Sequence, residues 1–331
     1  MMLTEISPQD RLSQLLSEDM DRVNALIQSR MASEHAPRIP EVTAHLVNAG
    51  GKRLRPLLTC ASAKICGYDG PYHIHLAATV EFIHTATLLH DDVVDESTQR
   101  RGRPTANLLW DNPSSVLVGD YLFSRSFQLM VETGSLRVLD ILANASATIA
   151  EGEVLQLSSA QDLATTEDTY FKVIRGKTAA LFAAACEVGG VIAGVPAAQS
   201  EALRAYGDAL GVAFQIADDL LDYGGTTAEL GKNVGDDFRE GKLTLPVIRA
   251  LSQASDEERS FWSSALEKRQ NTDDALAYAM NIMSKHGSLV STRSTAEAYA
   301  RQARAALGVL PKSEIRTILE DLADYVVARV T

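Results

Sequence analysis

The sequence predicts an all-α fold, and three observations support this prediction. Alanine and leucine are abundant, whereas runs of β-branched residues with strict alternation of apolar and polar positions are missing. The 10 prolines leave long proline-free stretches, in which a helix can continue without losing a backbone hydrogen bond. Within these stretches apolar residues recur at steps of three and four, as they do along one face of an α-helix.

Several stretches are expected to be helical. In the stretch 73–96, Leu76, Val80 and Ile83 recur at helical spacing. The stretch 201–223 is followed by Gly224 and Gly225, which suit a left-handed C-cap because glycine adopts positive φ without strain. The last alternates charged and apolar residues and is expected to hold two or three amphipathic helices. In chain order the stretches are 73–96, 114–133, 136–161, 201–223 and 256–330.

Composition and charge exclude some classes of protein. The 331 residues include 31 Lys and Arg against 43 Asp and Glu, a net charge of −12 that argues against broad binding to nucleic acid. The length allows two domains, but no low-complexity linker divides the chain, so a single domain over residues 1–331 is expected. No apolar run approaches about 18 residues, so no transmembrane segment is expected. The three cysteines show neither a disulfide nor a metal-ligand pattern, which favours a reducing, cytoplasmic location.

Two apolar helices are expected to end in the same acidic pattern, Asp-Asp-x-x-Asp. The outer acids of each copy are four residues apart, so their carboxylates project from one helix face and repel each other. Both copies lie near helix C-termini, where the negative end of the backbone dipole adds to the repulsion. The two copies are Asp91, Asp92 and Asp95, and Asp218, Asp219 and Asp222.

A bound cation would relieve this repulsion. The alternative, a solvated acidic face, is a common reason for a single Asp-Asp-x-x-Asp pattern, but two copies flanked by apolar residues disfavour it. Carboxylate oxygens are hard ligands that select Mg²⁺, and Mg²⁺ commonly bridges carboxylates to substrate phosphates. The spacing of an EF-hand calcium loop is absent from both copies.

Basic residues gather in five short segments, three of which follow an acidic motif along the chain. Each of them alone is more often a solvated surface charge, but as a set in an anionic chain they indicate a focused site for phosphate groups. The segments are 50–56, 99–103, 175–178, 231–233 and 241–242.

These segments together resemble the trans-isoprenyl diphosphate synthases, and within them the bacterial long-chain polyprenyl (octaprenyl- or decaprenyl-type) enzymes. The resemblance rests on GGKRLRP, LLHDDVVDESTQRRGRPTAN, IRGKTA, QIADDLLDY and GKNVGDDFREGKLTLP, and runs from about Gly50 to Pro246. It implies a single all-α domain of the isoprenoid synthase type, a helical barrel around a deep central cavity, usually paired as a homodimer. The two acidic helix ends would then face each other across the mouth of the cavity.

The resemblance also implies a role for each matching residue. Asp91, Asp95 and Asp218 would hold Mg²⁺, and Asp92, Asp219, Asp222 and Lys177 would also take part in catalysis. Contacts to the allylic diphosphate would come from Arg100, Lys177, Thr178, Gln215 and Lys232. Isopentenyl diphosphate would be bound by Lys52, Arg55, His84 and Arg101.

Three further side chains have competing explanations. A lone histidine on an apolar helix is more often a packed core residue, and only the family resemblance makes His84 a ligand of isopentenyl diphosphate. His90 is expected to be structural. Gln156 resembles a position that lines the cavity in the family, although simple packing would explain it nearly as well.

The implied reaction is a Mg²⁺-dependent, sequential condensation of isopentenyl diphosphate onto an allylic diphosphate such as farnesyl or geranylgeranyl diphosphate. Ala86 and Thr87 lie about one turn before Asp91, where a bulky aromatic residue floors the cavity in short-chain members of the family. Because both residues are small, we expect an all-trans product of about C40 to C50, suited to a quinone side chain and passed to membrane enzymes. The sequence leaves open the choice among C40, C45 and C50 and the preferred primer.

Two other functions use the same fold. A class I terpene cyclase typically carries a different second motif and needs no site for isopentenyl diphosphate, so the second Asp-Asp-x-x-Asp argues against it. A non-catalytic regulatory subunit would typically have damaged acidic motifs, and both motifs are intact here.

Overall fold

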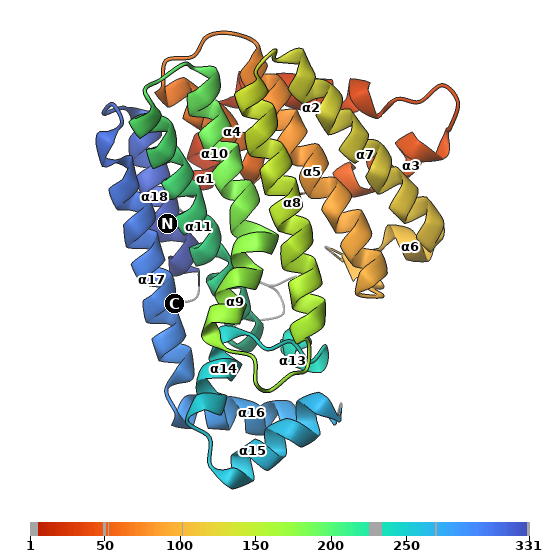
Figure 1. Ribbon diagram of the computed structural model, residues 1–331, viewed down its shortest axis with the longest axis vertical. Coiled ribbons are helices and arrows are strands. Elements are labelled where there is room, and N and C mark those ends of the chain that lie inside the picture. Colours follow the sequence, from red (N-terminus) through yellow and green to blue (C-terminus); the bar gives the residue numbers. More distant parts are fainter. Residues whose placement is uncertain are drawn as a thin grey trace, which may run out of the picture. The chain divides into compact units, whose positions relative to one another are not determined.

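The computed structural model describes residues 6–48, 51, 53–100, 102–224, 234–268 and 270–329. The regular secondary structure of these residues is helical, apart from one small antiparallel pair of strands in which Gln99 pairs with Pro104 and Arg100 with Arg103 (Figure 1). The predicted all-α class is therefore confirmed.

The first half of the chain contains the helices that lead to and follow the first acidic motif. They are α1 (Pro8–Leu15), α2 (Ser17–Met31), α3 (Arg38–Asn48), α4 (Leu54–Ile65), α5 (Tyr72–Val94), α6 (Ala106–Leu109), α7 (Asn112–Glu132) and α8 (Leu136–Ser159), with β1 (Gln99–Arg100) and β2 (Arg103–Pro104) between α5 and α6.

The second half contains the helices around the second acidic motif. They are α9 (Glu167–Ile174), the π-helix η1 (Arg175–Ala179), α10 (Ala180–Ile192), α11 (Ala197–Gly224), α13 (Asp236–Arg239), α14 (Leu245–Ser252), α15 (Asp256–Trp262), the π-helix η2 (Ser263–Glu267), α16 (Asp273–Lys285), α17 (Ser288–Ala306), the 3₁₀ turn η3 (Leu307–Val309) and α18 (Glu314–Ala328).

The four internal helices lie where the sequence predicts them. Helices α5, α7 and α8 agree with the expected stretches to within two residues at each end. Helix α11 begins four residues before the expected 201, directly after Pro196, which suits the entry to a helix because its ring presets φ. Gly224 is the last residue of α11, and Gly225 of the expected cap lies outside the described residues.

The C-terminal stretch contains more helices than the two or three expected. Its described residues form α15, α16, α17 and α18, because capping residues interrupt what sequence periodicity alone would join. Ser255 and Glu258 form a reciprocal capping box that begins α15, and the Thr272 side chain accepts a hydrogen bond from the Ala275 amide to begin α16. Gly287, with φ at +62°, separates α16 from α17.

The chain divides into two compact units, and each acidic motif belongs to a different one. Unit 1 comprises the described residues of Met1–Ser146, Leu181–Gly207 and Ala306–Leu319. At its centre α5 packs against α2, α4 and α7. Helix α5 is buried on most of its surface, which explains why its sequence is apolar nearly all round.

Unit 2 comprises the described residues of Ala147–Ala180, Asp208–Ala305 and Glu320–Thr331. One apolar cluster joins α9, η1, α11, α14 and α17 through residues such as Tyr170, Ile216 and Leu245. A second cluster surrounds Trp262 and Phe238 and joins the end of α11 to α13, α15 and α16. Both clusters include residues of α11, so the part of this helix that carries the second acidic motif packs within unit 2.

No helix among the described residues is both long enough and apolar enough to cross a membrane. The expectation of one domain over residues 1–331 stays a prediction.

Candidate active site

The three acids of the first motif lie in different environments within unit 1. Asp91 is in the last turn of α5 and partly exposed, and Asp95 caps the helix and is exposed. Asp92 is completely buried, and its Oδ1 accepts hydrogen bonds from Nε and Nη2 of Arg100, both at 2.8 Å. Burial raises the pKa of Asp92, and the Arg100 guanidinium opposes this rise. The outer acids can therefore hold a cation, while Asp92 anchors the predicted ligand Arg100.

Two of the residues predicted to bind isopentenyl diphosphate are brought together in unit 1. Nη1 of Arg55, on α4, lies 3.3 Å from Nε2 of His84, on α5. Because arginine can only donate, this His84 nitrogen acts as the acceptor. The Arg55 guanidinium also lies 4.5 Å from the centre of the Phe182 ring, in the geometry of a cation–π contact. The Arg55 head group is thus held by two partners from different helices.

Three predicted ligands cannot be placed. Lys52, Arg101 and Lys232 lie outside the described residues. Their assignments stay predictions.

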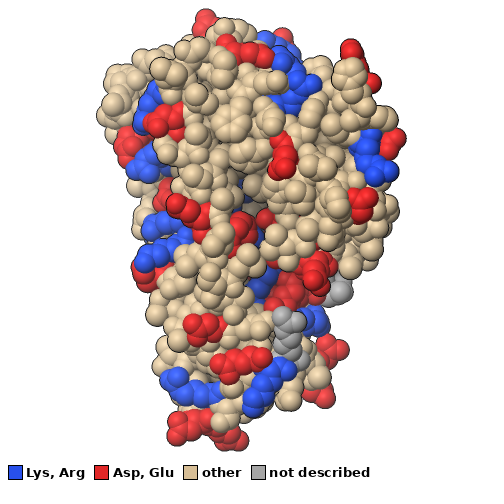
Figure 2. Space-filling model, turned by 45° about the vertical axis from the view of Figure 1, so that its right-hand side comes forward, with Lys and Arg blue, Asp and Glu red and all other residues tan. Residues whose placement is uncertain are grey.

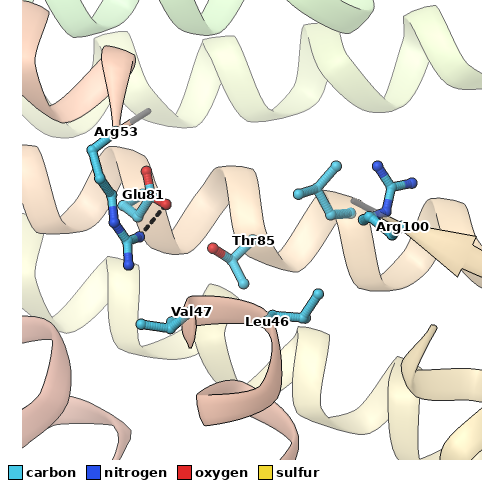
Figure 3. A pocket seen from close by; sticks show the side chains of 7 residues that line it. Leu46, Val47, Arg53, Glu81, Thr85 and Arg100 are labelled. Atoms are coloured by element: carbon cyan, nitrogen blue, oxygen red, sulfur yellow. Dashed lines mark hydrogen bonds and ion pairs between the residues drawn. The ribbon is translucent and has the colours of Figure 1, made fainter. Parts of the chain in front are cut away.

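A small pocket in unit 1 is lined by Arg53 and Glu81 at one end and Arg100 at the other (Figure 3). Arg53 precedes α4 with φ at +46°, a left-handed conformation that costs a non-glycine residue about 1–2 kcal/mol. Its guanidinium forms an ion pair with Glu81, which is buried on α5. This ion pair fastens Arg53 to α5, two residues before Arg55.

The acids of the second motif are also unequal. Asp218 is partly exposed, whereas Asp219 and Asp222 are only 3% and 4% exposed. The Asp222 carboxylate accepts a hydrogen bond from the Asp237 amide at 3.1 Å, and its carbonyl oxygen accepts one from the Gly235 amide at 2.8 Å. Asp222 thus anchors the start of α13 to the end of α11.

Asp219 is the centre of a buried hydrogen-bond network in unit 2. Its Oδ2 accepts from the hydroxyl of Tyr170 at 2.5 Å, and its Oδ1 accepts from Nε2 of Gln215 at 2.9 Å. The Gln215 Oε1 in turn accepts from the hydroxyl of Thr178 at 2.8 Å. Burial and the nearby charge of Asp237 raise the pKa of Asp219 well above its usual value. Burial and the charge of Asp219 raise the pKa of Tyr170, so its hydroxyl remains a donor.

Lys177 lies on the π-helix η1, and its Nζ contacts Oε2 of Glu153 at 2.9 Å and Oε1 of Gln156 at 3.0 Å, both on α8. Two glycines make this approach possible. A Cβ on Gly152 would lie 2.7 Å from the Lys177 backbone nitrogen, and one on Gly176 would lie 2.8 Å from the Gly152 Cα. Short π-helical segments are frequent at functional sites.

The residues expected to control product length lie along α5. Ala86 is completely buried, as is Ile83 one turn earlier, and Thr87 is partly exposed. The Thr87 hydroxyl donates to the His84 carbonyl oxygen at 2.9 Å.

Charge on the face shown in Figure 2 is mixed, with acidic and basic side chains interspersed over it. Three basic side chains in or next to the candidate site are instead each paired with an acid. Arg53, Arg100 and Lys177 each contact one carboxylate of their own unit.

The sequence pattern of the family described as "Polyprenyl synthetase" matches residues 36–283, which include both acidic motifs and all of the candidate ligands. The chain belongs to the polyprenyl synthetase family. The resemblance stated from the motifs is therefore confirmed, and the chain is a prenyltransferase.

Relatives of this polyprenyl synthetase agree over nearly its whole length. It is 45% identical to the octaprenyl diphosphate synthase of Escherichia coli over 97% of this chain and 98% of that protein. A crystal structure of a decaprenyl diphosphate synthase from Rhodobacter capsulatus is 69% identical, with a TM-score of 0.95 over 98% of this chain and 99% of that one. A polyprenyl synthase from Caulobacter crescentus, crystallised with calcium and isoprenyl diphosphate, is 53% identical, with a TM-score of 0.93 over 98% of each chain.

Several side chains of this polyprenyl synthetase that contact the candidate ligands were not identified from the sequence. Glu81 could have been found as an acid within an apolar stretch of α5, because a buried charge requires a partner. Glu153 carries no such signal, since it is partly exposed on a helix that also holds Glu151. No local signal marks Tyr170 or Asp237, since their partners are 49 and 15 residues away in the chain.

Proposed function

We infer that this chain is a long-chain trans-polyprenyl diphosphate synthase, which adds isopentenyl diphosphate units to an allylic diphosphate. The observation that supports this most directly is the agreement over nearly the full chain with an octaprenyl and a decaprenyl diphosphate synthase, at 45% and 69% identity. Fold likeness alone would not carry this inference, because relatives with the same fold can make shorter products.

The residues present suit Mg²⁺. Asp91 and Asp95 expose hard oxygen donors at a helix end, and Asp218 does so on α11. Among the described residues no three His, Cys, Asp or Glu side chains form a closed metal cage. Mg²⁺ does not need one, since it is usually held by one or two carboxylates together with water and substrate phosphates. When bound, Mg²⁺ would stabilise negative charge on the diphosphate leaving group.

In this proposal, carried over from the family resemblance, the ligands of the allylic diphosphate are Arg100, Lys177, Thr178 and Gln215. As the carbon–oxygen bond breaks, charge grows on the diphosphate oxygens, and donors that are already oriented stabilise that charge without reorganisation. The network from Asp219 through Gln215 to Thr178 supplies such an orientation. Lys232 joins this site on the family resemblance alone.

Isopentenyl diphosphate is assigned to Arg55 and His84, with Lys52 and Arg101 added on the family resemblance. These residues hold the diphosphate while the double bond attacks the allylic carbocation. The proton then lost passes to the departing pyrophosphate, so no separate base is needed. Apolar walls keep water from the carbocation.

The product is proposed to be all-trans and about C40 to C50 long, serving as a quinone side chain and passing to membrane enzymes. The small Ala86 and Thr87 support a long product, because neither blocks the path along α5.

A homodimer is also proposed. Helix α7 supports it with large apolar side chains that are exposed on the described chain, among them Leu117 and Val131 at 65% each. Such a surface fits a protein partner better than water.

The experiment that tests the proposed function is a turnover assay on the purified chain alone, with isopentenyl diphosphate and geranyl, farnesyl or geranylgeranyl diphosphate. Long linear products that require Mg²⁺ support the proposal. A cyclic hydrocarbon would instead indicate a terpene cyclase, and no turnover would indicate a regulatory subunit. Gel filtration of the same sample tests the dimer.

A further inference from the structure

The hydroxyl of Tyr170 enters the second acidic motif from α9, a helix that carries none of the predicted site residues. Its oxygen lies 2.5 Å from Oδ2 of Asp219. The Tyr170 ring is 5% exposed and belongs to the apolar cluster that includes Ile216 and Leu245. It also meets the Phe171 ring edge-on, with the ring centres 5.4 Å apart. Because the ring is held on several sides, the position of the hydroxyl is held too.

The rest of the network runs in one direction. The Gln215 amide nitrogen donates to Oδ1 of Asp219, so the Gln215 amide oxygen faces Thr178. The Thr178 hydroxyl donates to that oxygen. Tyr170 holds the other carboxylate oxygen of Asp219, which sets the plane in which Oδ1 meets Gln215.

We propose that Tyr170 is a positioning residue for the allylic diphosphate site, which sets the orientation of Gln215 and Thr178 through the carboxylate of Asp219. This inference rests on the proposed function, because that function makes Gln215 and Thr178 ligands of the allylic diphosphate. The second amide hydrogen of Gln215 is the donor that this orientation directs to a phosphate oxygen. Tyr170 itself contacts no substrate.

Removing the hydroxyl leaves Oδ2 of Asp219 buried without this donor. The carboxylate is then free to turn toward other donors, and Gln215 and Thr178 lose their common orientation. Because the loss concerns one diphosphate site, Tyr170→Phe is expected to raise KM for the allylic diphosphate roughly tenfold, the effect of one hydrogen bond to a charged group. KM for isopentenyl diphosphate should stay within about twofold of the wild-type value.

Tyr206→Phe is the matched control. Tyr206 is also fully buried, and its hydroxyl donates to the Leu319 carbonyl oxygen at 2.9 Å, within unit 1 and not to a residue of the candidate site. Both substitutions remove one buried hydroxyl. A purely structural effect should lower the melting temperature in both variants without separating the two KM values, whereas the positioning role separates them only in Tyr170→Phe.

A double-mutant cycle tests whether Tyr170 acts through Gln215. In a Gln215→Met background the network is already broken, so adding Tyr170→Phe should change the allylic KM by less than about twofold. Equal changes in both KM values of Tyr170→Phe would overturn the proposal, and so would an additive double mutant.

Binding of inorganic pyrophosphate with Mg²⁺, measured by calorimetry, gives a second readout that needs no turnover. We expect Tyr170→Phe to weaken it about tenfold relative to wild type, and Tyr206→Phe to leave it unchanged. Equal affinity in wild type and Tyr170→Phe would contradict the positioning role. Failure of the wild type to elongate an allylic primer would contradict the proposed function instead, so the two failures can be told apart.

Discussion

Asp92 and Asp219 occupy the same place in the same five-residue motif, yet the two units stabilise them differently. Both are buried, at 0% and 3% exposure. Asp92 faces a cation, with two nitrogens of Arg100 on one oxygen. Asp219 faces neutral donors, with Tyr170 on one oxygen and Gln215 on the other.

The difference teaches that the motif does not fix the partners of its second acid. The first acid is partly exposed in both units, at Asp91 and Asp218, whereas the second acid is buried and its stabilisation depends on which helices are packed there. The Arg100 guanidinium balances the charge of Asp92 and is anchored by it, whereas the neutral donors Tyr170 and Gln215 orient the carboxyl group of Asp219 without supplying a counter-charge.

The largest expected effect is on the first acid of each motif, which should behave alike in the two units. Asp91→Ala and Asp218→Ala should each lower kcat by about 100-fold to 1,000-fold, because each removes a group proposed to hold the cation that stabilises the leaving group. EDTA should abolish wild-type activity and Mg²⁺ should restore it.

Asp168→Ala provides the control for this pair, since Asp168 is an exposed acid on α9 that is paired with Lys172. It should retain wild-type turnover. Circular dichroism should show unchanged helicity in all three variants. Full activity in EDTA would refute the role of Asp91, Asp95 and Asp218 in holding the cation.

A second effect should separate the residues assigned to the two substrates. His84→Ala or Arg101→Ala should mainly raise KM for isopentenyl diphosphate, whereas Lys177→Ala should mainly raise KM for the allylic substrate. Each removes a contact to one diphosphate, worth about 1.5–3 kcal/mol or roughly 10-fold to 150-fold. Steady-state kinetics with each substrate varied in turn measures both constants. Equal shifts in the two constants would mean that the sites are assigned wrongly.

A third prediction compares equivalent positions of α5 and α11, on the N-terminal side of the two motifs. Ala86 and Ala213 each lie five residues before the first acid of their motif, and both are completely buried. Ala86→Phe should shorten the product toward about C15 to C20 while leaving the first condensation intact. Ala213 belongs to an apolar cluster of unit 2, so Ala213→Phe should lower stability by about 1–3 kcal/mol without shortening the product. Product chromatography and thermal melts provide the two measurements, and an unchanged product from Ala86→Phe would rule out this path for the growing chain.

The smallest effect concerns the inner acids, and it sharpens the comparison most. Asp92→Asn should destabilise the protein by about 1–3 kcal/mol, because Arg100 loses its charged acceptor. Asp219→Asn should keep or raise stability in the absence of metal, since burial disfavours its charged form.

The pH dependence supplies the sign of this last prediction. Because the folded pKa of Asp219 is raised, ionisation costs stability only above the ordinary carboxyl pKa of about 3.9. The stability gain of Asp219→Asn should therefore vanish below that pH and grow above it. Urea melts across the pH range test this, and a gain that is constant with pH would contradict it.

The sequence predicted what depends on local geometry. The helices that carry the two motifs follow from periodicity, and the structure confirms them as α5 and α11. The contact between Arg55 and His84 unites two residues that the family resemblance alone assigned to one substrate.

What the sequence did not predict depends on partners that are distant along the chain. The partners of Lys177 lie 24 and 21 residues away on α8, and the partner of Arg53 lies 28 residues away on α5. Periodicity carries no information about such pairs. Periodicity also predicted too few helices in the C-terminal stretch. Capping by single side chains such as Thr272 is too local to alter a pattern of apolar residues.

The ion pair between Lys177 and Glu153 has a consequence for repeated turnover. With a carboxylate already 2.9 Å from its ammonium group, Lys177 would exchange one anion for another when a diphosphate binds at the proposed allylic site. The gain on binding is only the difference between the two, and the same carboxylate is ready to take the ammonium back when pyrophosphate leaves. An enzyme that must release pyrophosphate after every addition benefits from this arrangement, because a lysine without its own counter-ion would hold the by-product more tightly and slow the next cycle.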